Sequence, residues 1–316
     1  MLKIAFHPIY KHPLPKGHRF PMSKYELLPQ QLLHEGTCKA ENFFEPKMLS
    51  EENILAVHTK EYFNSLLNLT LDKSAARKIG FPLSEALVQR GRIISQGTID
   101  CCEYALKYGI AMNIAGGTHH AYTDHGEGFC LLNDQAIAAK YLLMKYGTVD
   151  KTVPQQVRND NVVVNKILIV DLDVHQGNGT AKIFENDESV FTFSMHGAGN
   201  YPFEKEKSDL DIAIPDGSGD AIYLQKLKET LPKLIEEQKS DFIFYLSGVD
   251  ILETDKLGRL NCTVEGCKER DRFVLQLCKD LQIPVEVSMG GGYSPEIKTI
   301  IEAHANTFRL ATKIYF

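Results

Sequence analysis

The chain has 316 residues, of which 43% are hydrophobic and 24% are charged, a composition typical of a globular protein with a large core. Its formal net charge of -6 argues against direct nucleic-acid binding, because a nucleic-acid surface requires concentrated basic side chains. No stretch approaches the roughly 18 apolar residues of a membrane helix, so we expect no membrane association.

The cysteines and the N-terminal residues indicate the cellular compartment in which the protein is expected. Seven cysteines, including the adjacent Cys101 and Cys102, show no Cys-x-x-Cys spacing, which argues against a disulfide framework and a thiolate zinc site. The short apolar run before His7 and Pro8 does not resemble an export signal. We therefore expect a cytoplasmic protein, or a nuclear one if the source is a eukaryote. The oligomeric state cannot be predicted.

Strand and helix patterns alternate along the chain. Residues 2–6 are expected to form a strand, and the five prolines of residues 7–29 predict an irregular loop that leads into a helix over 23–35. Further helices are expected at 84–107, 134–146, 180–185, 219–237 with a kink or break at Pro232, 264–281, and from a cap at Ser294 and Pro295 to 311. Further strands are expected at 110–115, 167–170, 189–194, 241–246 and 285–288. Residues 147–165 are predicted to be an inserted surface loop. This alternation predicts a single α/β domain over residues 1–316.

The central strand at 167–170 runs directly into a cluster of possible metal ligands. Its residues are apolar without alternation, which indicates a strand covered on both faces. Side chains of an extended chain alternate, so Asp171, Asp173 and His175 are expected to point the same way. A lone Asp at this place is more often a helix cap, but three such groups in register favour a site at the C-terminal end of the strand.

Other polar groups also follow predicted strands. His119 and His120 come after a double glycine, Asp250 ends another apolar strand, and Tyr293 follows three glycines. An isolated histidine pair has an even chance of being only a cap and a solvated side chain. Together, Asp173, His175 and Asp250 would leave a divalent metal with open positions, as hydrolysis requires. Mixed oxygen and nitrogen ligands suit zinc and are compatible with Fe²⁺, Mn²⁺ or Co²⁺.

Five motifs carry a resemblance to a known family. They are Gly-Gly-Thr-His-His at 116–120, Gly-Phe-Cys at 128–130, Asp-Leu-Asp-Val-His-Gln-Gly-Asn-Gly at 171–179, Gly-Val-Asp at 248–250 and Gly-Gly-Gly-Tyr at 290–293. In order and spacing they resemble the zinc-dependent histone deacetylase family over nearly the whole chain. The resemblance implies the arginase and deacetylase fold, a three-layer αβα arrangement around an eight-stranded, mainly parallel sheet.

The resemblance also implies an activity and a set of roles. The expected substrate is the acylated lysine of a protein or peptide, the cofactor Zn²⁺ with Fe²⁺ as an alternative in the cell, and K⁺ a structural ion. The implied metal ligands are Asp173, His175 and Asp250, and the implied catalytic residues are His119, His120, Tyr293, Asp171 and Asn178. The implied substrate contacts are Phe129, Tyr201, Leu257, Gly128 and Gly291, and the implied potassium site comprises Asp171, Asp173, His175, Ser194 and Met195. Arg19 resembles the family arginine deep in the acetate-exit region.

One motif departs from the commonest family pattern. Many members have Asp where this chain has Asn178, so that each histidine of the pair contacts its own aspartate. The variant is similar to class IV deacetylases and related bacterial sequences. A neutral amide beside His120 should leave its imidazole easier to deprotonate than a histidine paired with Asp. Cys130 lies next to this site, where a packed thiol is favoured over a nucleophile.

Two alternative functions are weighed against lysine deacylation. Acetylpolyamine hydrolysis would require acidic residues at the tunnel mouth, whereas the apolar Leu257 at the expected gatekeeper position favours acyl-lysine. A catalytically silent acyl-lysine-binding protein would be expected to have lost a ligand or the tyrosine. This sequence retains all of them, so the enzyme is the favoured prediction.

Overall fold

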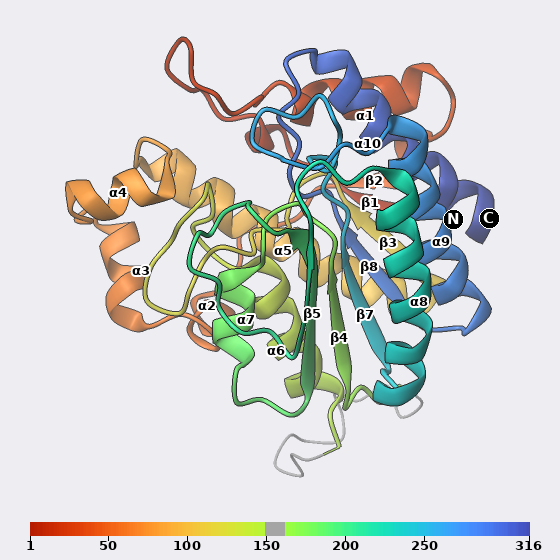
Figure 1. The fold of residues 1–316 in the computed structure, drawn as a ribbon. Helices are drawn as coiled ribbons and strands as arrows, with labels where there is room; N and C mark the ends of the chain where they lie inside the picture. The colour runs from red at the N-terminus through yellow and green to blue at the C-terminus, as the bar shows by residue number, and fades with distance from the viewer. Residues whose placement is uncertain (149–161) are drawn as a thin grey trace.

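One eight-stranded sheet forms the centre of the described part of the chain. The computed structural model describes residues 1–148 and 162–316. The strand order is β2-β1-β3-β8-β7-β4-β5-β6, and every pair of neighbours is parallel (Figure 1). The strands are β1 (Lys3–Ala5), β2 (Phe43–Phe44), β3 (Ile110–Asn113), β4 (Ile167–Asp171), β5 (Val190–Gly197), β6 (Leu210–Ile214), β7 (Phe242–Leu246) and β8 (Val285–Ser288).

Helices cover both faces of this sheet. They are α1 (Lys24–His34), α2 (Glu51–Leu55), α3 (Lys60–Leu67), α4 (Lys73–Ile79), α5 (Glu85–Tyr108), α6 (Asp134–Tyr146), α7 (Asn178–Phe184), α8 (Asp220–Gln238), α9 (Val264–Asp280) and α10 (Ile297–Tyr315), with short 3₁₀ turns at Pro8–Tyr10 and Ala40–Asn42. In Figure 1, α5, α6 and α7 lie on one side of the sheet, and α8, α9 and α10 on the other, with α1 packed on α10. The predicted three-layer αβα architecture is confirmed, and the sheet is wholly parallel.

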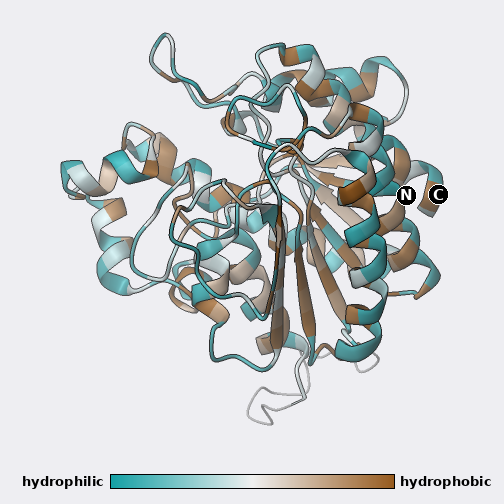
Figure 2. Ribbon diagram, viewed as in Figure 1, coloured by the Kyte–Doolittle hydropathy of each residue, from teal (hydrophilic) through white to brown (hydrophobic). Residues whose placement is uncertain are grey.

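The hydrophobic pattern explains this arrangement. Every residue of β3, β4, β7 and β8 is buried, because these central strands have helices on both faces. Figure 2 shows the apolar colour concentrated on the strands and the polar colour on the outer faces of the helices. Among the described helices, none has the length and apolar character needed to cross a bilayer.

Several predicted boundaries are wrong for physical reasons. α10 begins at Ile297 with Glu296 as its cap, because the Ser294 hydroxyl instead forms a hydrogen bond with the hydroxyl of Thr254 at 2.7 Å. Pro232 does not divide α8, which runs as one helix whose inner face buries Tyr223, Leu227, Leu231, Leu234 and Ile235. α7 begins at Asn178 rather than at residue 180.

Other elements were not predicted. β2 and β6 were not predicted, since β2 has two residues and β6 is an edge strand that is only partly buried. The short helices α2, α3 and α4 were not predicted either. In the predicted surface loop at 147–165, the backbone N–H of Thr148 donates to the side-chain oxygen of Asn165 at 2.9 Å. The middle of that loop lies outside the described residues.

Candidate metal and catalytic site

The candidate residues meet at one edge of the sheet because the strands that precede them are neighbours. β3, β8, β7 and β4 are consecutive in the sheet and parallel, so their C-terminal ends lie side by side. The loops after them carry the histidine pair, Tyr293, Asp250 and the Asp173–His175 segment. The strand order therefore brings together groups separated by up to 174 residues in sequence, as the difference between 293 and 119 shows.

Asp173, His175 and Asp250 form a compact buried group. One ligand atom from each lies within 4.8 Å of the others, and all three residues are buried. The Nδ1 atom of His175 lies 2.9 Å from Asp173 Oδ1 and 3.2 Å from Asp250 Oδ2. β4 ends at Asp171, so Asp173 and His175 lie in bends after the strand, yet their side chains converge as predicted.

The donor set fits a divalent cation. Asp250 Oδ2 is buried and accepts no hydrogen bond among the described residues, although a buried carboxylate oxygen normally has a partner. Burial and the charge of Asp173 raise the pKa of Asp250. Burial alone would lower the pKa of His175, but the hydrogen bond with Asp173 and the charges of both carboxylates raise it. A cation bound by Asp173, His175 and Asp250 would take the place of the proton that these three side chains hold in its absence.

Gly291 lies against the same carboxylates. A Cβ atom at this position would be 2.0 Å from Asp250 Oδ2 and 2.7 Å from Asp173 Oδ2, closer than any real contact. The backbone N–H of Gly291 donates to Asp173 Oδ2 at 2.9 Å. The absence of a side chain at 291 therefore lets the backbone approach and orient the two candidate ligands.

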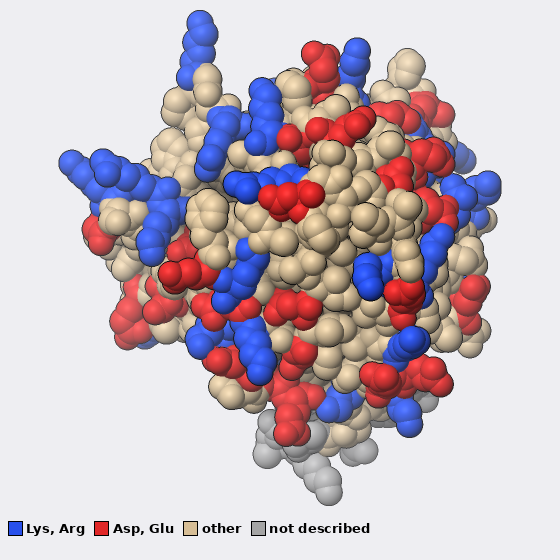
Figure 3. Space-filling model, in the orientation of Figure 1, with Lys and Arg blue, Asp and Glu red and all other residues tan. Residues whose placement is uncertain are grey.

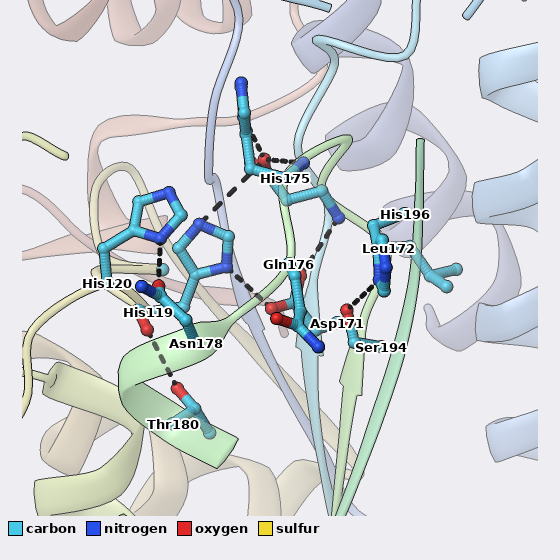
Figure 4. Close-up of polar contacts among 12 residues, drawn as sticks. His119, His120, Asp171, Leu172, His175, Gln176, Asn178, Thr180, Ser194 and His196 are labelled. Carbon is cyan, nitrogen blue, oxygen red and sulfur yellow. Dashed lines mark hydrogen bonds and ion pairs between the residues drawn. The ribbon is translucent and has the colours of Figure 1, made fainter. Parts of the chain in front are cut away.

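The two histidines lie beside the candidate metal ligands, with ring centroids 4.1 Å apart. His119 Nδ1 lies 2.6 Å from Asp171 Oδ2, and His120 Nδ1 lies 2.6 Å from Asn178 Oδ1, as the dashed lines in Figure 4 show. Each histidine thus has the polar partner that the family resemblance implied. Asp171 also accepts from the backbone N–H of Asp173 at 3.1 Å, which joins the pair to the metal loop.

The partners separate the pKa values of the two imidazoles. Burial lowers the pKa of His119, but the charge and hydrogen bond of Asp171 outweigh it and the net shift is upward. Burial and the neighbouring His119 and His175 lower the pKa of His120 well below its usual range, which the hydrogen bond with the neutral Asn178 does not offset. His120 is therefore the member of the pair that loses its proton more easily.

Tyr293 lies near the candidate metal ligands and lines the same space as His175. Its ring lies 6.4 Å from the His175 ring and 6.0 Å from the Phe129 ring, centroid to centroid. Burial raises the pKa of Tyr293 well above its usual range, so the hydroxyl stays protonated and can donate a hydrogen bond.

A cleft of about 550 Å³ leads from the surface to these groups. Phe129, Tyr201 and Leu257 line it, as predicted, and the His120 ring lies 5.0 Å from the Tyr201 ring, centroid to centroid. Gly128 also lines it, and a Cβ there would be 2.4 Å from His120 Cδ2. Four of the five predicted substrate-contact residues therefore line the cleft, and the fifth, Gly291, lies against the candidate metal ligands.

Cys130 and the predicted potassium residues lie next to the site. Burial raises the pKa of Cys130, which keeps the thiol protonated and agrees with the packed interpretation. Ser194 on β5 pairs in register with Asp171 on β4, and Met195 follows it. The Ser194 hydroxyl lies 3.0 Å from His196 Nδ1 (Figure 4). The predicted potassium residues are thus neighbours in space.

The prediction for Arg19 is wrong. This residue is exposed at the mouth of the cleft, where its guanidinium lies 5.0 Å above the Phe129 ring. Two other basic residues, Lys24 and Arg90, are instead buried. Lys24 donates from Nζ to the carbonyl of Gly290 at 3.1 Å, and burial lowers its pKa to about 8. Neither burial was predicted, and for Lys24 the reason is that a Lys in the first turn of a helix normally faces solvent.

Comparisons with known proteins agree with this geometry. The family model described as "Histone deacetylase domain" matches residues 18–308. An uncharacterised protein of Picosynechococcus sp. is 41% identical over 99% of both chains. Histone deacetylase 2 of Arabidopsis thaliana is 27% identical over 90% of this chain and 72% of its own length.

Two further relatives extend the comparison. The acetoin utilization protein AcuC of Staphylococcus aureus is 25% identical over 87% of this chain and 72% of its own. The crystal structure of a histone deacetylase homologue from Aquifex aeolicus superposes with a TM-score of 0.81, at 23% identity over 98% of this chain and 84% of that chain. The solved structure shares the fold, and the family model covers most of the sequence. The chain therefore belongs to the histone deacetylase family.

Proposed function

We propose that this protein is a metal-dependent amidohydrolase that removes acetyl groups from lysine side chains of proteins or peptides. The observation that carries the proposal is the buried Asp173–His175–Asp250 group beside a histidine pair at the inner end of a cleft. We also infer that Zn²⁺ or Fe²⁺ occupies this group and that K⁺ lies near Asp171 and Ser194. Family membership and the donor chemistry support these assignments.

The chemistry is divided among the chain's own residues. A divalent cation held by Asp173, His175 and Asp250 would polarise the amide carbonyl and acidify a water molecule. His120, the neutral imidazole, accepts the proton of the attacking water and later delivers it to the leaving amine. The Tyr293 hydroxyl donates to the oxyanion that develops on the former carbonyl oxygen.

The mouth of the cleft favours acyl-lysine over an acetylated polyamine. Arg19, Lys78 and Arg259 line this mouth, and Glu127 is the acidic residue among its lining. Glu127 already accepts a hydrogen bond from the Tyr201 hydroxyl and lies 3.5 Å from Lys78 Nζ. In Figure 3, Lys and Arg side chains also gather over α4, which contains Lys78. A polycationic chain would meet like charges there, whereas the neutral amide of an acylated lysine would not.

The inner chamber favours a short acyl group. The space beyond the cleft, lined by residues that include Tyr25, Arg90, Ile94, Asp173 and His175, has a volume of about 40 Å³. Such a small chamber has room for a methyl group but would have to expand for a long acyl chain. We therefore infer acetyl as the preferred group.

A substrate panel tests the proposed function. The purified, metal-loaded protein should hydrolyse acetyl-lysine peptides, and it should act at least about tenfold more slowly on decanoyl-lysine peptides and on acetylated spermidine. The measurement is kcat/KM for each compound, with a chelator-treated sample as the control. A clear preference for the polyamine would select the alternative amidohydrolase function, and no turnover of any amide would favour a silent binding protein.

The departure at Asn178 leads to a prediction about pH. Asn178→Asp places a carboxylate beside His120, and a nearby negative charge stabilises the imidazolium form. The apparent pKa of the base in kcat/KM should therefore rise, and activity below neutrality should fall while activity at high pH is kept. Because His119 and His120 are adjacent, the measured value is macroscopic and the prediction concerns its direction. A profile that stays in place or moves toward acid, at unchanged metal content, would contradict it.

A further inference from the structure

The orientation of Asn178 is determined by contacts on the side away from His120. The Nδ2 atom of Asn178 donates to the Tyr122 hydroxyl oxygen at 3.0 Å and to Glu127 Oε2 at 3.4 Å. These two acceptors account for both amide hydrogens. The carboxamide oxygen is therefore left facing His120 Nδ1 at 2.6 Å. Asn178 is 1% exposed, so no solvent is available to replace a lost partner.

This orientation fixes the tautomer of His120. An amide oxygen can only accept a hydrogen bond, so His120 Nδ1 must carry a proton. In the neutral ring, Nε2 is then the unprotonated nitrogen that can accept a proton from water. The opposite orientation of the amide would turn its oxygen toward the Glu127 carboxylate and its NH₂ group toward His120. Two oxygen acceptors would then face each other, and Nε2 would carry the proton in the neutral ring.

Glu127 is held as an acceptor by its other neighbours. The Tyr201 hydroxyl donates to the same Oε2 atom, while Lys78 Nζ lies 3.5 Å and His125 Nε2 3.6 Å from Oε1. Its side chain is 13% exposed, so it is partly shielded from water. The Tyr201 hydroxyl and the Lys78 ammonium group both present hydrogens to this carboxylate. A negative charge thus lies directly behind the neutral amide of Asn178.

A second carboxylate reinforces the same orientation. The Tyr122 hydroxyl donates to Glu206 Oε1 at 3.2 Å, and burial raises the pKa of Tyr122, which keeps this hydroxyl protonated. Its single hydrogen is directed to Glu206, so the Tyr122 oxygen presents a lone pair to Asn178. The hydrogen bonds therefore run in one direction from His120 through Asn178 to Tyr122 and Glu206.

We propose that Glu127 is a positioning residue that acts on His120 through Asn178. Asn178 has no charge of its own, and the Glu127 carboxylate supplies a negative charge on the side of Asn178 that faces away from His120. This inference rests on the proposed function, since it concerns the residue that moves the proton. The Tyr122–Asn178–Glu127 contacts involve neither the candidate metal ligands nor Tyr293, and the proposal gives them a role in catalysis.

A double-mutant cycle tests the proposal. Glu127→Gln should lower kcat on the order of tenfold. The introduced glutamine has no negative charge, so it neither polarises the Asn178 amide nor excludes the flipped orientation of that amide. In an Asn178→Asp background, the same Glu127→Gln change should have no cost or should raise kcat. The aspartate introduced at position 178 would supply the negative charge beside His120 itself. It has no amide hydrogens to donate to Glu127, and its charge would repel that of Glu127. Glu204→Gln, an exposed carboxylate-to-amide change in the loop after Tyr201, is the matched control and should leave kcat unchanged in both backgrounds.

The cycle separates this role from a general role at the cleft mouth. An effect of Glu127 on substrate binding or folding would be equal in both backgrounds, and equal losses would overturn the proposal. Metal content and melting temperature are measured on all four proteins to show that they are folded and loaded.

A spectroscopic measurement tests the contact independently of turnover. The imidazole ¹⁵N shifts of His120, assigned by their loss in His120→Gln, should report a protonated Nδ1 in the parent and a mixture of tautomers in Glu127→Gln. An unchanged tautomer together with unchanged kcat would refute the proposal. If the parent protein hydrolyses none of the amides in the panel, the proposed function fails, while the tautomer measurement still tests the role of Glu127.

Discussion

Asp173→Ala is expected to abolish binding of the divalent cation and, with it, measurable amide hydrolysis. Asp173 provides one of three grouped ligand atoms and also accepts the hydrogen bond from the backbone of Gly291. Without it, His175 and Asp250 cannot complete a three-ligand site with an open position. Metal analysis should find about one equivalent in the parent and background levels in the variant.

Stability measurements provide a second check on the same prediction. A cation that binds only the folded state stabilises it by about 2.7 kcal/mol at a free concentration of one hundred times its Kd. The melting temperature of the parent should therefore rise on adding Zn²⁺, and that of Asp173→Ala should not. Asp280→Ala, which removes an exposed carboxylate on α9, is the control and should behave as the parent. A fully active Asp173→Ala protein, or two catalytic cations per chain, would refute the assignment.

Tyr293→Phe should leave the cation in place and lower kcat by roughly 10² to 10³, the cost of one oxyanion donor, or about 3–4 kcal/mol. The hydroxyl is protonated because burial raises the pKa of Tyr293, and removing it leaves the aromatic contacts with Phe20 and Phe129 intact. The effect should appear mainly in kcat, since the donor acts on charge that develops in the transition state.

Metal content and rate should be measured on the same Tyr293→Phe samples. Retained metal with a large loss of kcat would support the role of the hydroxyl as a donor. Loss of metal equal to that of Asp173→Ala would instead place Tyr293 among the ligands. A turnover within threefold of the parent would mean that another group stabilises the oxyanion.

The boundaries of the central elements could be predicted closely, whereas the peripheral ones could not. β8 and α6 have the predicted bounds, and β4 extends one residue beyond its prediction to include Asp171. These elements have strong apolar patterns because they are buried on one or both faces. In contrast, β6 is an edge strand with partly exposed residues, so its hydrophobic pattern is weak.

The positions of individual side chains were less predictable. Arg19 and Lys24 lie five residues apart, and their sequence contexts give no reason to expect that the first is exposed and the second fully buried. Ser294 and Pro295 have the residue types of a helix start, but Ser294 bonds to Thr254 instead. In each case a contact from a distant part of the chain decided the outcome.

The sequence by itself determined the family, the alternation of strands and helices, and the identity of the residues grouped as candidate metal ligands. These properties depend on local patterns, such as an apolar run followed by Asp and His in alternation. Only the tertiary structure decided that β3 and β4 lie on opposite sides of β8 and β7, so that His120 reaches Asn178, and that Glu127 contacts the far side of that amide. The reason is that strand order and loop packing depend on long-range contacts, which a local pattern does not specify.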